Sequence, residues 1–180
     1  MSRIGCKGKY TGNAERDLLR ALQLPIALYY VEIPIVEPSD RKTERTMQLP
    51  IILPHLTVEY LLQSRKVEVC QSEIQKYWSH LRDAKVPWAL QHPGAFSCAP
   101  LGVYGDEGQI SKAGEKVMVV TFNFVLDNRA GDGVIHRFPI ATLREWCSLG
   151  MRSLHPLTQV MAWSFNVARL VFHTVMSTTC

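Results

Sequence analysis

The stretch between residues 100 and 146 constrains the fold of this chain more than any other. It contains three apolar runs, each bounded by Gly, Asp or Pro. The middle run, EKVMVVTFNFVLDNR, is rich in β-branched and aromatic side chains, which suit a pleated, half-buried surface better than a helix. The segment DNRAGDG after it is typical of a turn, because its two glycines can take positive φ. The pattern predicts three neighbouring strands, at about 100–105, 116–126 and 133–142.

Helical periodicity predicts the remaining elements, at about 14–24, 55–64, 71–83 and 156–172. The 71–83 segment places Ile74, Tyr77, Trp78 and Leu81 on one face, and such an aromatic stripe is more typical of a core than of a base-stacking surface. The chain is therefore expected to have an α+β fold, with a small, mainly antiparallel sheet packed with helices. The expected core consists of Val103, Val117, Val119, Phe122, Leu126, Ile140, Met161, Phe165 and Ala168.

A charged segment, EPSDRKTERT at 37–46, is the clearest candidate for a linker, since it has no apolar member beyond its proline ring. It separates an N-terminal helix and extended segment (1–36) from an α+β domain (47–180), which is expected to be either a whole domain or a truncated larger one. Pro34 should restrict the late part of the extended segment to a sheet edge or a non-sheet extension, and Pro50 and Pro54 should break any regular ladder after the linker.

Charge and cysteine usage narrow the class of protein. The chain has 20 basic and 16 acidic residues. Residues 1–90 contain 13 basic and 10 acidic residues, and residues 91–180 contain 7 basic and 6 acidic residues. This even spread does not indicate nucleic acid as a partner, although it permits one. The five cysteines form no C-x-x-C pair, which is typical of reduced thiols in an intracellular protein, nuclear or cytoplasmic. Neither a signal peptide nor an apolar run of about 18 residues is visible, so no membrane partner is expected.

Asp106 and Glu107 are the candidate catalytic residues, and Asp106 is the candidate metal ligand. They follow the first predicted strand, where adjacent carboxylates could hold a divalent metal or act as a general base. The alternative is structural, because Gly105-Asp106-Glu107-Gly108 also has good turn composition, and this interpretation is favoured.

Other catalytic motifs are not found in the sequence. The six histidines have no H-x-x-x-H or H-E-x-x-H spacing, and no serine lies in a G-x-S-x-G elbow. The spacing of glycines and lysines in 105–116 does not match a phosphate-binding loop. Cys147 lies near Arg144, which could lower a thiol pKa, but a buried, inert cysteine is the favoured interpretation. No cofactor is therefore expected.

Seven blocks in a fixed order carry a family resemblance: LPIILPH, IQKYWSHL, VPWALQHP, PLGVYGDE, EKVMVV, RFPIATLREW and LHPLTQVMAWSFNVA. They resemble the blocks of a large, multi-copy family of uncharacterised proteins in protist genomes, over roughly residues 30–170. That family has no established activity, so the resemblance implies no catalytic residue. Its copy number implies descent from a mobile element of the transposase-like kind.

Two functional hypotheses follow. The leading one is a non-catalytic interaction or mobile-element-derived domain of unknown role. The alternative is a truncated RNase H-like transposase or nuclease remnant, because three strands followed by a helix begin such a core, with Asp106 as first ligand of a Mg²⁺ pair. The chain departs from that pattern, since no Asp or Glu follows Glu145.

Overall fold

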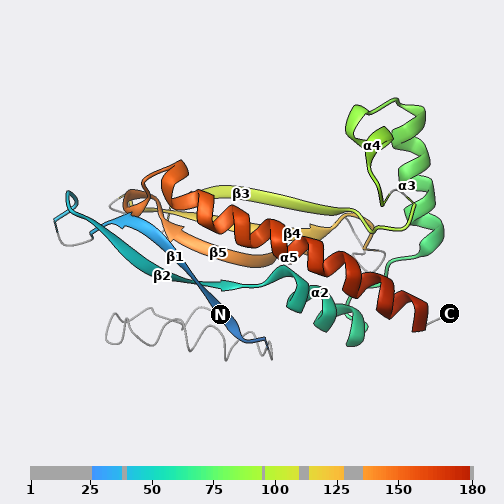
Figure 1. The fold of residues 1–180 in the computed structure, drawn as a ribbon, viewed down its shortest axis with the longest axis horizontal. Coiled ribbons are helices and arrows are strands. Elements are labelled where there is room, and N and C mark those ends of the chain that lie inside the picture. Colours follow the sequence, from blue (N-terminus) through green and yellow to red (C-terminus); the bar gives the residue numbers. More distant parts are fainter. Residues whose placement is uncertain (1–25, 38–39, 95, 110–113, 128–135, 179–180) are drawn as a thin grey trace.

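The computed structural model describes residues 26–37, 40–94, 96–109, 114–127 and 136–178 (Figure 1). Within these ranges the chain forms two antiparallel sheets, of two and three strands, with helices packed on them, which confirms the predicted α+β class. The predicted helix at 14–24 lies outside the described residues. The elements in chain order are β1 (Leu28–Val36), β2 (Glu44–Ile52), α2 (Pro54–Gln63), α3 (Gln71–Asp83), α4 (Pro87–Gln91), β3 (Leu101–Gln109), β4 (Lys116–Phe124), β5 (Phe138–Arg144), the 3-10 turn η3 (Glu145–Cys147) and α5 (Met151–Thr178).

A regular hairpin, β1–β2, occupies the region in which Pro50 was expected to interrupt pairing, and Pro34 lies in an edge strand, one of its two predicted positions. The two strands pair from Leu28 opposite Ile52 to Val36 opposite Glu44, and the charged segment 37–46 supplies their connection and the start of β2. Pro34 fits because its carbonyl accepts a hydrogen bond from the Ser153 hydroxyl of α5. Its backbone polar groups therefore face away from β2, and the missing N–H removes no bond of the ladder. Pro50 lies four residues after Thr46, the partner of Pro34. Because hydrogen-bonded and non-hydrogen-bonded pairs alternate along the ladder, the backbone groups of Pro50 also face away from the partner strand.

The second sheet is the predicted meander, with strand order β3-β4-β5. Its strands differ from the predicted ranges mainly at β3, which continues to Gln109, because the ladder with β4 extends through the Gly-Asp-Glu-Gly segment. The interpretation of that segment as a turn was therefore wrong. β5 begins at Phe138 and contains a register shift opposite Val120 and Thr121, which accommodates Pro139.

Helix α5 is longer than predicted and begins at Met151, before Pro156. Gly150 precedes it with a φ of +62°, which glycine adopts without strain, and the Leu149 N–H donates to the Ser153 hydroxyl at 2.8 Å. The sequence interpretation took Pro156 as the start of the helix, whereas it lies inside the helix and near its N-terminal end. The connection between α3 and β3 contains the short helix α4, which begins at Pro87.

A buried hydroxyl joins α5 to the start of α2. Leu53 occupies the N-cap position of α2 and has no side-chain group that can cap the helix. Ser164 of α5 takes this role, because its Oγ accepts from the His55 N–H at 3.1 Å and lies 2.9 Å from His55 Nδ1. Burial lowers the pKa of His55, so the ring is neutral and Ser164 can donate to it.

The hydrophobic core lies between the two sheets and α5. Phe122 of β4 is fully buried, and its ring contacts Phe138 of β5 and Phe165 of α5, with centroids 5.5 and 5.9 Å apart. Burying one such side chain contributes about 2–3 kcal/mol. Of the predicted core, Phe122, Ile140, Met161 and Ala168 are buried, while Val117, Val119, Leu126 and Phe165 are partly buried. Val103 was wrongly predicted, since it is 50% exposed on the edge strand β3.

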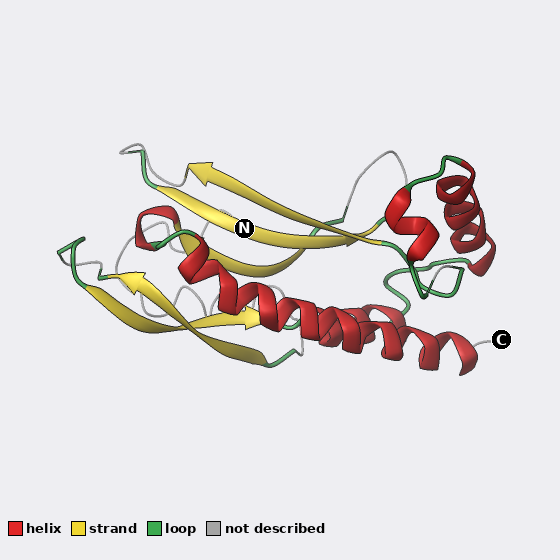
Figure 2. Cartoon of the chain, turned by 45° about the horizontal axis from the view of Figure 1, so that its top comes forward, coloured by secondary structure: helices red, strands yellow, loops and turns green. Residues whose placement is uncertain are grey.

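Helices α3 and α4 form an annex at one end of the molecule (Figures 1 and 2). As predicted, α3 turns Ile74 and Trp78 inward. The Trp78 ring lies against Trp88 of α4 and His92, with centroids 5.8 and 4.8 Å away. The annex therefore has a small aromatic core of its own, and it connects to the body through the chain that leads from α4 to β3.

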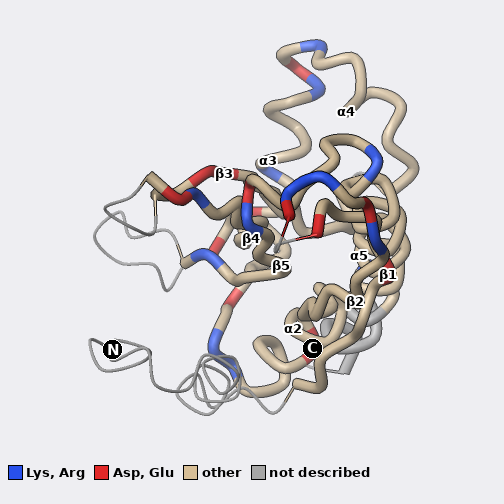
Figure 3. The backbone as a smooth tube through the Cα atoms, turned by 90° about the vertical axis from the view of Figure 1, so that its left-hand side faces the viewer, with Lys and Arg blue, Asp and Glu red and all other residues tan. Residues whose placement is uncertain are grey.

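At the opposite end, around the β1–β2 connection, charges of both signs are interspersed (Figure 3). Arg45 pairs with Glu37 at 2.8 Å, and Arg152 of α5 makes a two-pronged contact with Glu44 at 2.7 and 2.8 Å. The hydrogen bonds with Arg152 lower the pKa of Glu44, and the same contact raises the pKa of Arg152. Among the described helices, none combines the length and apolar character needed to cross a bilayer.

Candidate ligand-binding site

The two carboxylates singled out from the sequence lie within β3 rather than beyond its end. Asp106 pairs in register with Val119 and Glu107 with Met118, so the neighbouring side chains leave opposite faces of the sheet. Both side chains are exposed. Glu107 contacts Lys116 of β4 at 3.5 Å, and Lys116 also lies 3.8 Å from Glu145. The pair diverges and cannot chelate one ion together.

No group of three or more His, Cys, Asp or Glu side chains in the described part of the chain could hold a metal ion. Cys147 is 6% exposed, and burial raises its thiol pKa despite the nearby Arg144, which fits the predicted inert cysteine. The Ser164–His55 contact resembles half of a nucleophilic pair, but Ser164 has no solvent exposure, so substrate cannot reach its hydroxyl.

A pocket of about 290 Å³ lies where the annex meets the body. Its walls come from α2, α5, the strands β3 and β4, and the connection from α4 to β3. Its lining is mainly apolar and includes three phenylalanine rings. The lining residues are Val58, His92, Cys98, Ala99, Leu101, Val103, Phe124, Phe165, Asn166, Ala168, Arg169 and Phe172. We call this hollow the junction pocket.

Regular secondary structure sets the directions of the side chains that line the junction pocket. Phe165, Ala168 and Phe172 of α5 follow the i, i+3, i+7 spacing of one helix face. Leu101 and Val103 of β3 are two residues apart and therefore point to the same face of the sheet. An α-helix and an edge strand thus present apolar side chains to one shared space.

The remaining wall, from the α4–β3 connection, is fastened to the annex. The Trp78 indole N–H donates to the Cys98 carbonyl at 2.9 Å, and the Gly94 N–H donates to His92 Nδ1 at 3.1 Å. Gly94 is buried, and a Cβ there would collide with the Cys98 sulfur and press on the His92 ring. Glycine at this position therefore lets His92 and Cys98 come together at the pocket.

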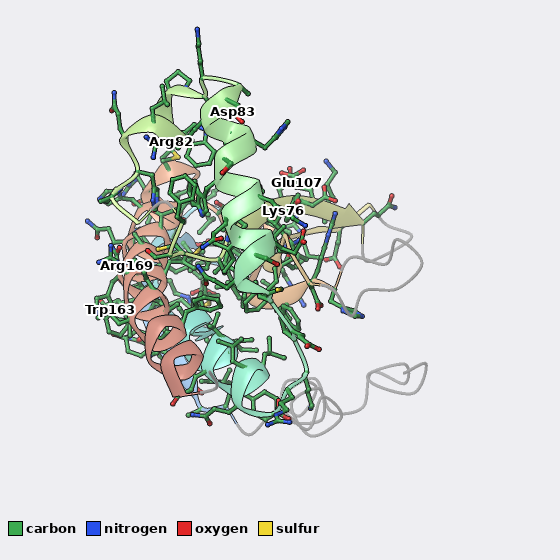
Figure 4. The ribbon with its side chains drawn as sticks, turned by 90° about the vertical axis from the view of Figure 1, so that its right-hand side faces the viewer. Lys76, Arg82, Asp83, Glu107, Trp163 and Arg169 are labelled. Carbon is green, nitrogen blue, oxygen red and sulfur yellow. The ribbon has the colours of Figure 1, made fainter. Side chains whose placement is uncertain are left out.

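The polar groups of the pocket are biased towards hydrogen-bond donors. Because His92 Nδ1 accepts from Gly94, the proton of the neutral ring is on Nε2, which is a donor. Asn166 of α5 adds an amide to the lining. Arg169, three residues further along the same helix, adds a guanidinium (Figure 4). No described acidic residue makes an ion pair with Arg169, and no carboxylate lines the pocket. The junction pocket thus has positive charge without a matching negative one.

A second hollow, of about 490 Å³, is wider and more open. It is lined by Leu61, Lys66, His136, Arg137 and Phe138. Its lining residue His136 directly follows residues 128–135, which lie outside the described part of the chain. The junction pocket is therefore the better-defined candidate.

Sequence reasoning missed the residues of the junction pocket, since His92, Asn166 and Arg169 belong to no motif. One signal was available: Arg169 follows Asn166 by three residues in a helix that contains no acid. An arginine of such a helix can pair only with an acid from another segment, as Arg152 does with Glu44, and no described acid does so for Arg169. The pairing of that helix with the distant β3 strand could not be read from this pattern.

Comparison with known proteins gave no match: no family model, no curated protein and no solved structure resembles the chain significantly.

Proposed function

We propose that this chain is a non-catalytic binding domain whose junction pocket holds the apolar part of a small organic ligand. The observation that carries the proposal is the apolar hollow itself. Phe124, Phe165 and Phe172 border a space of about 290 Å³ at the junction of two parts of the molecule. Small-molecule sites are typically concave, mainly apolar and located at such junctions, with a few polar groups at defined positions.

The position of the pocket also gives binding a structural consequence. Its walls belong both to the body, through α5 and β3, and to the connection held by Trp78 of the annex. A ligand that contacts both walls buries apolar surface on each of them and stabilises their association. Ligand binding should therefore raise the unfolding temperature, because a ligand that prefers the folded state stabilises it by mass action.

The test uses the neutral probe 3-phenylpropionamide and a variant with a blocked pocket. Val103→Trp places a large ring at the rim from an exposed position, where a strand tolerates an aromatic residue. Tyr104→Trp is the matched control, because the adjacent side chain of β3 leaves the opposite face. The probe should raise the unfolding temperature of the wild type and of Tyr104→Trp, but not that of Val103→Trp.

Two results would contradict the proposal. An equal shift in all three proteins would mean that the probe binds elsewhere. A wild type that shows neither a thermal shift nor chemical-shift changes in an NMR titration with the probe would mean that the junction pocket does not bind apolar ligands.

A further inference from the structure

We infer that the ligand of the junction pocket is a small organic acid, with an aromatic or aliphatic body and one carboxylate that Arg169 binds. This inference deepens the proposed function and rests on it. The proposed function concerns only the apolar body of the ligand. The inference assigns the chemistry of its polar end.

The charge of the pocket supports this assignment. Among the described residues that line the pocket, Arg169 is the only Lys or Arg, and none is an Asp or Glu. Helix α5 has no acidic residue, and none follows Glu145 anywhere in the sequence. A ligand with one negative charge would therefore neutralise the site, whereas a cationic ligand would meet only repulsion.

The hydrogen-bonding groups point the same way. A guanidinium presents parallel N–H donors that match the two oxygens of a carboxylate. Asn166, one helical turn away, can donate a further hydrogen bond, and His92 keeps its free ring proton on Nε2 because Nδ1 is occupied by Gly94. A carboxylate accepts hydrogen bonds and donates none, so it complements this set.

The apolar part of the pocket determines the rest of the ligand. Three phenylalanine rings, from β4 and α5, line the same hollow as Arg169 and Asn166. A ligand with a ring and a short chain to its carboxylate can contact both parts at once. A single guanidinium balances one unit of charge, which favours a carboxylate over a doubly charged phosphate.

The experiment compares 3-phenylpropionate with its neutral amide by isothermal titration at one pH and salt concentration. The wild type should bind the acid about fivefold more tightly than the amide, the upper end for one charge pair with an arginine that is itself exposed. Arg169→Gln should abolish this preference, so that the variant binds the acid and the amide with equal affinity. Arg169→Lys should restore part of it, because lysine keeps the charge but loses the fork of donors. Arg152→Gln is the matched control, since this arginine of α5 pairs with Glu44 outside the pocket.

The two proposals fail in different ways. If the wild type binds acid and amide equally, or if Arg169→Gln keeps the preference, the assignment of the carboxylate is wrong and the apolar pocket stands. If neither probe binds, the proposed function fails, and the inference fails with it.

Discussion

Replacement of Ser164 by alanine tests the contact that joins α5 to α2. The hydroxyl is fully buried and interacts with two groups of His55, the backbone N–H at 3.1 Å and Nδ1 at 2.9 Å. Because Leu53 cannot cap α2, the variant leaves that N–H without its partner. An unsatisfied buried donor costs about 1–3 kcal/mol, and loss of a helix cap costs about 0.5–2 kcal/mol.

These two figures describe the same lost contact and do not add. His55 is only partly buried, so water can reach it in part, and we expect the free energy of unfolding to fall by about 1–2 kcal/mol. The assay is urea unfolding followed by far-UV circular dichroism. The control is Thr158→Ala, which removes an exposed hydroxyl that bonds only to the His155 carbonyl of the same helix. Its effect should stay within about 0.5 kcal/mol.

The reasoning would be refuted by a Ser164→Ala variant that unfolds at the same urea concentration as Thr158→Ala and the wild type. That result would show that the α2 terminus finds another partner, and that Ser164 does not fix the register of the two helices.

Three further predictions concern acid–base and metal chemistry. Burial lowers the pKa of His55, so the unfolded state takes up the proton first as the pH falls through the ordinary histidine pKa of about 6.5. Unfolding experiments should therefore show a larger loss of stability below that pH in the wild type than in His55→Gln, and equal losses would contradict the assignment. Iodoacetamide should modify Cys70 before Cys147. The hydrogen bond with Ser72 lowers the thiol pKa of the exposed Cys70, whereas burial raises the thiol pKa of Cys147. The order of modification can be followed by peptide mass mapping, and the reverse order would contradict this prediction. Incubation with DNA and Mg²⁺ or Mn²⁺ should give no cleavage that Asp106→Asn abolishes, whereas Asp106-dependent cleavage would favour the nuclease alternative.

Local sequence patterns determined the strands and helices whose side chains follow a clear period. The β-branched run in β4 and the aromatic stripe of α3 both form as predicted, because alternation and helical spacing act through neighbouring residues. Helix α3 matches its predicted range, 71–83. The three-strand meander followed for the same reason, since short connections between such runs favour antiparallel neighbours.

Pro50 and the glycines of the Gly-Asp-Glu-Gly segment misled the prediction, because pairing with the neighbouring strand of a hairpin outweighed the local preference of these residues. Pro34 and Pro50 lie within a regular ladder because their backbone groups face away from the partner strand. The Gly-Asp-Glu-Gly segment is a strand because β4 pairs with it along its whole length. Each of these outcomes depends on which edge of a strand faces its partner, and a single segment does not carry that information.

The junction pocket was decided by tertiary structure alone. Arg169 of α5, Val103 of β3 and His92 of the α4–β3 connection are far apart in the chain and share no motif, yet they line one hollow. The sequence determined the charge of α5 and the apolar character of its face, because both are properties of one helix. Only the packing of α5 beside an edge strand and the annex connection brought those properties together around a space that a ligand can enter.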